Sequence, residues 1–161
     1  QFVGGKMAIR FAVKNDLEQI NVLRKEVNDI HVNEKPEFFK AGFSDELRNH
    51  IYTIWNDPKQ KIVVNEHNGK IYGFAILNCI IQPENPFMYE RKFLSIDEFC
   101  VDKTCRKTGI ATEMILFIRN YAIQKNFNRI ELSVWEFNQD ALTFYEAKGF
   151  SPYLRHMEMI V

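Results

Sequence analysis

Apolar residues recur at two different spacings along the chain, and each spacing predicts a type of secondary structure. The run Leu94–Val101 is apolar over most of its length, which is typical of a buried strand. After a short polar turn, apolar residues return at intervals of three and four, which indicates a helix with one apolar face. These residues are Ile110, Met114, Ile115, Ile118, Tyr121 and Ala122. We take this strand–turn–helix as the centre of the fold.

A strand and two helices are predicted at the start of the chain. Residues 8–13 alternate in polarity and are expected to form the first strand. Asn15 and Glu18 have the spacing of a capping box, so a helix should begin at Asn15 and end near residue 33. Ser44 has the side chain of an N-cap and predicts a second helix, which ends before Pro58. The first helix is expected to turn inward Leu17, Ile20, Val22, Leu23, Val27 and Ile30.

The remaining elements predict a mixed α/β domain. Residues 61–66 and 70–81 form a hairpin around Asn68-Gly69, because Asn-Gly favours a tight turn between strands. Residues 129–135 predict another strand, and a short helix follows from Asn138 to Gly149, its C-terminal cap. Residues 150–161 are expected to supply the last strand or strands. This order gives a mixed sheet with helices on both faces.

Length, charge and apolar content exclude several classes of protein. The 161 residues suit one domain, which we assign to residues 7–161, and residues 1–6 (QFVGGK) are interpreted as a remnant of cloning. Basic and acidic side chains balance at 21 each, so no overall charge attracts nucleic acid or an anionic membrane. No apolar run approaches the roughly 20 residues that span a bilayer, and no signal peptide is recognised.

The cysteines and histidines favour a cytoplasmic protein without a bound metal. Cys79, Cys100 and Cys105 are odd in number and lack paired spacing, which is typical of free thiols in a reducing compartment. The four histidines are scattered without metal-ligand spacing. We therefore expect no metal.

The turn before the central helix has the features of an anion site. The first N–H groups of a helix have no internal partner and lie at the positive end of its dipole. Gly109 lets an anion approach the backbone, and Arg106 and Lys107 add positive charge. The turn lacks the Gly-Lys-Ser/Thr of a nucleotide-binding P-loop. An ordinary helix start with a turn glycine would look the same.

Two motifs together resemble the GNAT superfamily of N-acetyltransferases. Arg106, Gly109 and Ala111 match its Arg/Gln-x-x-Gly-x-Gly/Ala loop, although Lys107 stands where the family usually has glycine. The second motif comprises Asn138, Ala141, Phe144, Tyr145, Gly149 and Phe150. The resemblance covers residues 8–161. It implies a mixed, mostly antiparallel twisted sheet of six or seven strands with helices on both faces.

The resemblance implies acetyl-CoA as the co-substrate. Pyrophosphate would bind the N–H groups of the turn, and the pantetheine arm would pair with the central strand like an added strand. Asn138 would contact the pantetheine arm, or serve only as an N-cap. The expected cofactor-binding residues are Phe99, Cys100, Val101, Arg106, Lys107, Thr108, Gly109, Ile110, Ala111, Thr112, Asn138, Ala141 and Phe144.

The resemblance also suggests how protons are handled. Tyr145 matches the general acid that protonates the leaving thiolate, and its alternative role is that of a core aromatic residue. The backbone of Val101 would stabilise the oxyanion. Asp97 and Glu98 are candidate bases, but neighbours on a strand point to opposite faces, so only one should face the cleft, and a bulge here would change which of the two it is. We favour Asp97 slightly, and a water relay remains open.

The acceptor site is the least defined. By resemblance its walls come from the first two helices and their loop, where His31, Phe38 and Phe39 are the substrate-binding candidates. Phe43 and the loop around Met88 and Tyr89 are further candidates. Aromatic side chains suit an amine through cation–π contacts, although such rings also pack in cores.

The function expected from the resemblance is acetyl-CoA-dependent N-acetylation of a primary amine, on a small molecule or a peptide, by direct attack in a ternary complex. The resemblance also allows a homodimer. One alternative is a non-catalytic acyl-CoA-binding regulatory module. Another, a transferase acting on charged tRNA, is disfavoured by the balanced charge.

Overall fold

The computed structural model describes residues 7–161, so the proposed cloning remnant, residues 1–6, lies outside the described residues. The strands are β1 (Ala8–Phe11), β2 (Gln60–His67), β3 (Lys70–Gln82), β4 (Arg91–Val101) and β5 (Ile130–Leu132). The helices are α1 (Leu17–Glu34), α2 (Asp45–Asn56), α3 (Ile110–Gln124) and α4 (Gln139–Ala147), with short 3₁₀ turns η1 (Lys14–Asp16) and η2 (Lys103–Cys105).

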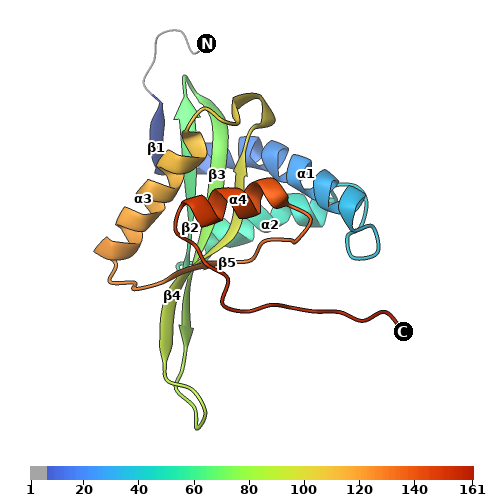
Figure 1. Ribbon diagram of the computed structural model, residues 1–161. Helices are drawn as coiled ribbons and strands as arrows, with labels where there is room; N and C mark the ends of the chain where they lie inside the picture. Colours follow the sequence, from blue (N-terminus) through green and yellow to red (C-terminus); the bar gives the residue numbers. More distant parts are fainter. Residues whose placement is uncertain (1–6) are drawn as a thin grey trace.

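The strands form one mixed, mostly antiparallel sheet, as expected. Its order is β1-β2-β3-β4-β5, with antiparallel neighbours from β1 to β4. β5 runs parallel to β4, because α3 carries the chain back between them. The β3–β4 hairpin projects well beyond the rest of the sheet (Figure 1).

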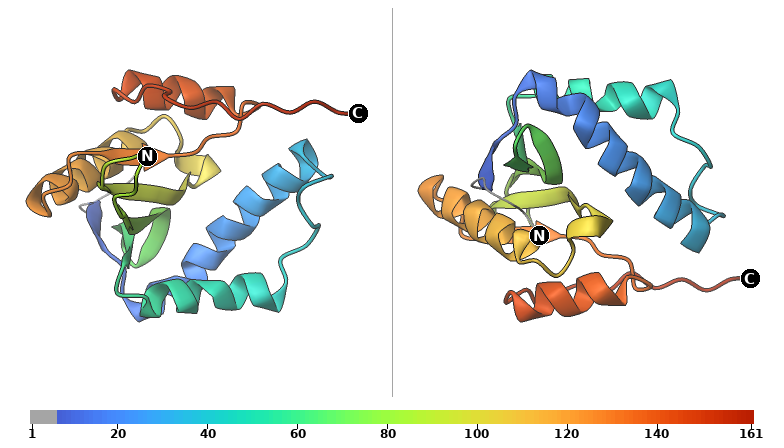
Figure 2. Two further views of the ribbon diagram at one scale, coloured as in Figure 1. Left: turned by 90° about the horizontal axis from the view of Figure 1, so that it is seen from below. Right: turned by 90° about the horizontal axis from the view of Figure 1, so that it is seen from above.

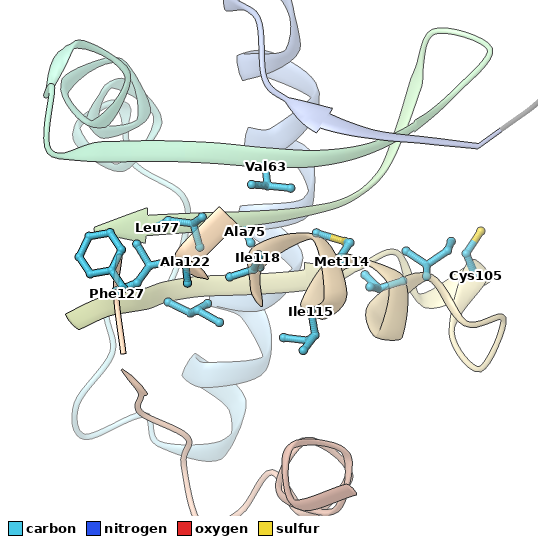
Figure 3. Packing of buried hydrophobic residues seen from close by; sticks show 13 residues of the cluster. Val63, Ala75, Leu77, Cys105, Met114, Ile115, Ile118, Ala122 and Phe127 are labelled. Atoms are coloured by element: carbon cyan, nitrogen blue, oxygen red, sulfur yellow. The ribbon is translucent and has the colours of Figure 1, made fainter. Parts of the chain in front are cut away.

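Helices cover both faces of the sheet. The views from above and below show α1 and α2 on one face and α3 and α4 on the other (Figure 2). Under α3 lies a core that includes Ala75, Leu77, Met114 and Ile118 (Figure 3). A second core packs α1 and α2 against Phe74 and other sheet residues. None of the helices in residues 7–161 has the length and apolar character needed to cross a bilayer.

The start and the inward face of α1 differ from the prediction. Asn15 lies in the 3₁₀ turn η1 rather than capping α1, and the Asp16 carboxylate accepts a hydrogen bond from the Val13 N–H at 2.8 Å. Val22 is 63% exposed, so its inward assignment was wrong: it lies on the outer side of a helix whose Leu17, Ile20 and Leu23 are buried. Ile30, also expected inward, is 41% exposed.

The expected strands at the C-terminal end do not form within the described residues, so the sheet has five strands rather than six or seven. β5 covers only residues 130–132 of the predicted 129–135. Residues 150–161 have no regular secondary structure. Tyr153 still donates a hydrogen bond to Glu131 of β5 at 2.7 Å, and the end of the segment extends away from the sheet (Figure 1). Alternating apolar residues make a strand only where a neighbouring strand accepts their backbone hydrogen bonds, and this segment has none in the described structure.

A β-bulge interrupts the centre of the sheet. Ile76 of β3 pairs with Glu98, whereas the next residue, Leu77, pairs with Ile96, so Asp97 is the extra residue on β4. An extra residue reverses the alternation of side chains beyond it. Accordingly Ile96 and Phe99, an odd number apart, both pack on the α3 side.

Candidate functional site

The sheet opens between β4 and β5 next to a cavity of about 1240 Å³. β5 pairs with β4 only from Leu94 to Ile96, so in the described part of the chain the outer edge of β4 has no strand partner beyond Ile96. The cavity is lined by residues of α1, β4, α4, the turn before α3 and the segment between β5 and α4.

Within residues 7–161, the open edge of β4 carries backbone groups that no neighbouring strand pairs. The N–H of Asp102 donates to the Tyr72 carbonyl oxygen at 2.8 Å, on the β3 side. Because N–H groups alternate along a strand, those of Phe99 and Val101 point the other way, into the opening. The carbonyl of Val101 also faces this side, where it accepts a hydrogen bond from Arg106 Nε at 3.4 Å.

The turn from Arg106 to Gly109 presents the start of α3 to the same cavity. Gly109 takes the N-cap position with φ of 94° and gives no side-chain cap, so the first N–H groups of α3 have no acceptor from it. A Cβ added at Gly109 would meet nothing within 4 Å. Lys107 also has positive φ, 62°, a conformation that favours glycine. This positive φ explains why the loop motif described above usually has glycine at the position of Lys107.

The predicted cofactor-binding residues gather around this opening. All of them except Thr108 line the cavity, and the Thr108 hydroxyl instead donates to the Cys105 carbonyl oxygen at 2.6 Å. Asn138 caps α4 by accepting a hydrogen bond from the Ala141 N–H at 3.2 Å, so its capping role is confirmed. Burial raises the pKa of the Cys100 thiol to about 12, which keeps it protonated at neutral pH.

Tyr145 lies on α4 at the wall of the cavity. Its ring packs edge to face against Phe99 and Phe150, with centroids 6.2 and 5.6 Å apart. Burial raises the pKa of its phenol to about 12. Among residues 7–161 its hydroxyl group has no hydrogen-bond partner. The phenol is therefore a neutral proton donor at every pH near 7.

Asp97 and Glu98 lie on the same face of the sheet, so the expectation that only one would face the cleft was wrong. The bulge at Asp97 is the physical reason, because it reverses the alternation between them. Both line the cavity. Asp97 is exposed and accepts hydrogen bonds from Ser95 Oγ at 2.5 Å and Asn78 Nδ2 at 3.2 Å.

Glu98 is held by a buried arginine that sequence reasoning missed. Arg24 of α1 is 6% exposed and donates to Glu98 from Nε at 3.0 Å and from Nη2 at 3.0 Å. Its Nη1 donates to the Leu47 carbonyl oxygen at 2.9 Å. Arg24 lies at helical spacing from Ile20, on the inward face of α1, and a charged residue in such a position signals a buried partner.

An aromatic cluster borders the cavity near the C-terminal half of α1. His31 stacks on Phe39 with centroids 4.9 Å apart, and Trp135 stacks on Phe137 at 5.9 Å. Burial lowers the pKa of His31, while the negative charge of Glu98 acts in the opposite direction. His31 lines the cavity together with Trp135 and Phe137, two residues that the sequence did not single out.

The other proposed acceptor residues divide between three places. Phe43 lines the cavity, whereas Phe38 and Phe39 pack around its aromatic border without lining it. Met88 and Tyr89 line a separate hollow of about 710 Å³ that also includes Arg91 and Tyr153. Within residues 7–161, no group of three or more His, Cys, Asp or Glu side chains could hold a metal ion.

The chain is similar to known acetyltransferases. The model of the acetyltransferase (GNAT) family matches residues 24–150, more than half of the chain. Among solved structures, the tetramutant of the BH1408 protein from Bacillus halodurans has a TM-score of 0.91 and 27% sequence identity, covering 96% of this chain and 100% of that one. A comparison with curated proteins gives no match.

Two more distant structures share the fold. The aminoglycoside N-acetyltransferase AAC(6')-Iy, in complex with CoA, has a TM-score of 0.77 at 18% identity, with 98% of this chain and 96% of that chain covered. A transcriptional regulator from Bacillus halodurans C-125 has a TM-score of 0.76 at 20% identity, with 97% and 100% covered. Similarity at this level shows the fold alone, but the family model spans the strands, the turn and the helices that surround the cavity. The chain therefore belongs to the GNAT family of acetyltransferases.

Proposed function

We propose that the chain transfers the acetyl group of acetyl-CoA to a primary amine of a small molecule or peptide, by direct attack in a ternary complex. One observation carries the proposal. A single cavity joins the open edge of β4, the start of α3 and a protonated tyrosine. These are the groups needed to hold a thioester, bind its phosphates and supply a proton.

The residues of the opening suit CoA. The N–H groups of Phe99 and Val101 can pair with an extended amide chain as a neighbouring strand would. The first turn of α3 can bind a pyrophosphate, with Arg106 and Lys107 beside it and room above Gly109. Acetyl-CoA supplies an activated carbonyl carbon that the amine can attack.

Tyr145 and Asp97 are our candidates for moving protons. A phenol with a pKa near 12 stays protonated and can give its proton to a departing thiolate. The oxygens of Glu98 are engaged by Arg24, whereas Asp97 is exposed and bonded only to neutral donors. Asp97 is therefore better able to receive the ammonium proton, directly or through water.

The test is the release of CoA thiol by the unmodified chain and by Tyr145→Phe. Loss of one hydroxyl should lower kcat by roughly 10- to 1,000-fold, within or below the usual range for general-acid help, and leave KM for acetyl-CoA within a few-fold. Tyr121→Phe is the matched control, since Tyr121 is a half-buried tyrosine of α3 that does not line the cavity. Full activity of Tyr145→Phe would remove the phenol from the reaction.

The pH profile gives a second readout for Tyr145. The protonated phenol is the active form, and its pKa is raised from 10 to about 12. Its contribution to kcat should therefore persist through pH 10 and disappear only near pH 12.

A chain that binds acetyl-CoA in calorimetry but acetylates no amine would instead be the regulatory acyl-CoA-binding module.

We also propose that residues 7–161 act as one catalytic unit in the cytoplasm. The three cysteines are unpaired in the structure, which suits a reducing compartment. If the chain resides in the cytoplasm, thiol titration of freshly isolated protein should count three reduced cysteines.

A further inference from the structure

The apolar face of α1 continues beyond the part of the helix that the sheet covers. Ile20 and Leu23 are buried against the sheet, but Ile30, farther along the same face, is 41% exposed. Ile30 lines the cavity together with Val27 and His31. This apolar stripe faces a cavity rather than a core, so an apolar ligand that covers it would remove apolar surface from water, which is favourable.

The segment between β5 and α4 supplies an aromatic wall of the same cavity. Trp135 and Phe137 stack at 5.9 Å with an interplanar angle of 17°, and both line the cavity. The ring of His31 lies 6.4 Å from that of Trp135, so the aromatic wall meets the stripe of α1. Trp135 remains 38% exposed, which leaves part of its surface available for contact.

The charges at this end of the cavity suit one ammonium group. Glu98 is neutralised by the bidentate contact with Arg24, which itself lines the cavity. Asp97 has only neutral hydrogen-bond donors, Ser95 and Asn78. Glu34 at the end of α1 and Asp140 in the first turn of α4 also line the cavity, and both are exposed, as Asp97 is. A polycation would need several unpaired carboxylates close together, whereas Asp97 is the one unpaired carboxylate that the described sheet residues contribute to the lining, and Glu34 and Asp140 lie at the ends of two different helices.

We propose that the acceptor is a monoamine whose single ammonium group is carried on an aromatic or branched apolar body, rather than a polyamine or an aminoglycoside. The ammonium group would lie toward Asp97 and the apolar body between Ile30 and Trp135. This inference rests on the proposed N-acetyltransferase function. It differs from the substrate named for AAC(6')-Iy, a protein that shares the fold at 18% identity.

The test compares four acceptors in the acetyl-CoA thiol-release assay: 2-phenylethylamine, isoamylamine, spermidine and kanamycin. We expect kcat/KM for the two apolar monoamines to exceed that for the two polycations by at least about tenfold. Trp135→Ala should lower kcat/KM for 2-phenylethylamine by about tenfold and leave KM for acetyl-CoA unchanged, whereas Trp135→Phe should retain most activity. Phe87→Ala is the control, because Phe87 is an aromatic residue 96% exposed on the β3–β4 turn.

A second variant tests the wall of α1 independently. Ile30→Asp places a carboxylate beside the apolar wall, and it should shift the ratio of kcat/KM toward spermidine. Preference of the unmodified chain for kanamycin or spermidine would overturn the inference and leave the proposed function intact. Acetyl-CoA binding without acetylation of any of the four amines would overturn the inference, and the same result with N-terminal peptide amines would overturn the proposed function as well.

Discussion

Single residues set the chemistry of the cavity through a buried ion pair. Arg24 is enclosed by α1, α2 and β4, with hydrogen bonds to Glu98, the Leu47 carbonyl and Asn21 Oδ1. This network fixes one carboxylate and leaves its neighbour, Asp97, to face the solvent of the cavity. Two adjacent acids thereby have different surroundings: an arginine holds Glu98, and neutral donors contact Asp97.

Removal of Arg24 should show how much stability is lost when the Glu98 carboxylate has no countercharge. Arg24→Gln leaves the half-buried Glu98 carboxylate without a countercharge, and we expect the free energy of unfolding to fall by about 3 kcal/mol. The double variant Arg24→Gln/Glu98→Gln should recover a large part of that loss, because no charge is then left alone. Urea denaturation of both variants provides the measurement. Equal losses in the two would show that Arg24 stabilises the fold by packing alone.

At the scale of elements, the site depends on the close approach of α3 to the sheet. Gly73 lies on β3 opposite Val101, directly beneath the first turns of α3. A Cβ there would lie 2.9 Å from Met114 Sδ and 3.1 Å from the Cys100 carbonyl oxygen. The absence of a side chain at Gly73 therefore sets how closely the start of α3 can lie to the open edge of β4.

Gly73→Ala should displace the Met114 side chain and press on the backbone of β4 at Cys100. We expect the free energy of unfolding to fall by about 1–3 kcal/mol, the usual cost of overpacking. The same substitution should cost less in a Met114→Ala background, where the nearer of the two contacts is gone. Thermal melts of the four chains in this cycle measure the difference. An identical cost in both backgrounds would assign the strain to the backbone of β4 instead.

The elements that the sequence predicted are those with local signals. Ser44 accepts a hydrogen bond from the Leu47 N–H at 3.3 Å, and Asn68 and Gly69 both have positive φ in the hairpin turn. Capping and turn geometry depend on a few neighbouring residues, so they can be recognised in a sequence.

The features that the prediction missed depend on distant partners. The bulge at Asp97 exists only in the register between β3 and β4, and the pairing of Arg24 with Glu98 joins residues 74 positions apart. Trp135 was assigned to a strand, but β5 ends at Leu132 and the ring belongs to the cavity wall. Local patterns contain no information about such pairings.

At the scale of the whole molecule, the sheet is complete on one side and open on the other. β2, β3 and β4 are paired along most of their lengths and lie between the two cores. Beyond Ile96, the β5 side of β4 has no strand partner within residues 7–161. The protection of backbone amides from hydrogen exchange should therefore change from one residue to the next along β4.

Amide hydrogen exchange would make that difference visible. In the absence of CoA, the N–H groups of Phe99 and Val101 should exchange quickly and that of Cys100 slowly, because only the last points to β3. CoA should slow the first two, together with the amides of residues 110–112, and leave Cys100 as it was. Equal protection of all three amides without CoA would mean that the edge of β4 is already covered. The exchange rates along β4 would thus distinguish the backbone amides that pair within the folded chain from those that remain available to a ligand.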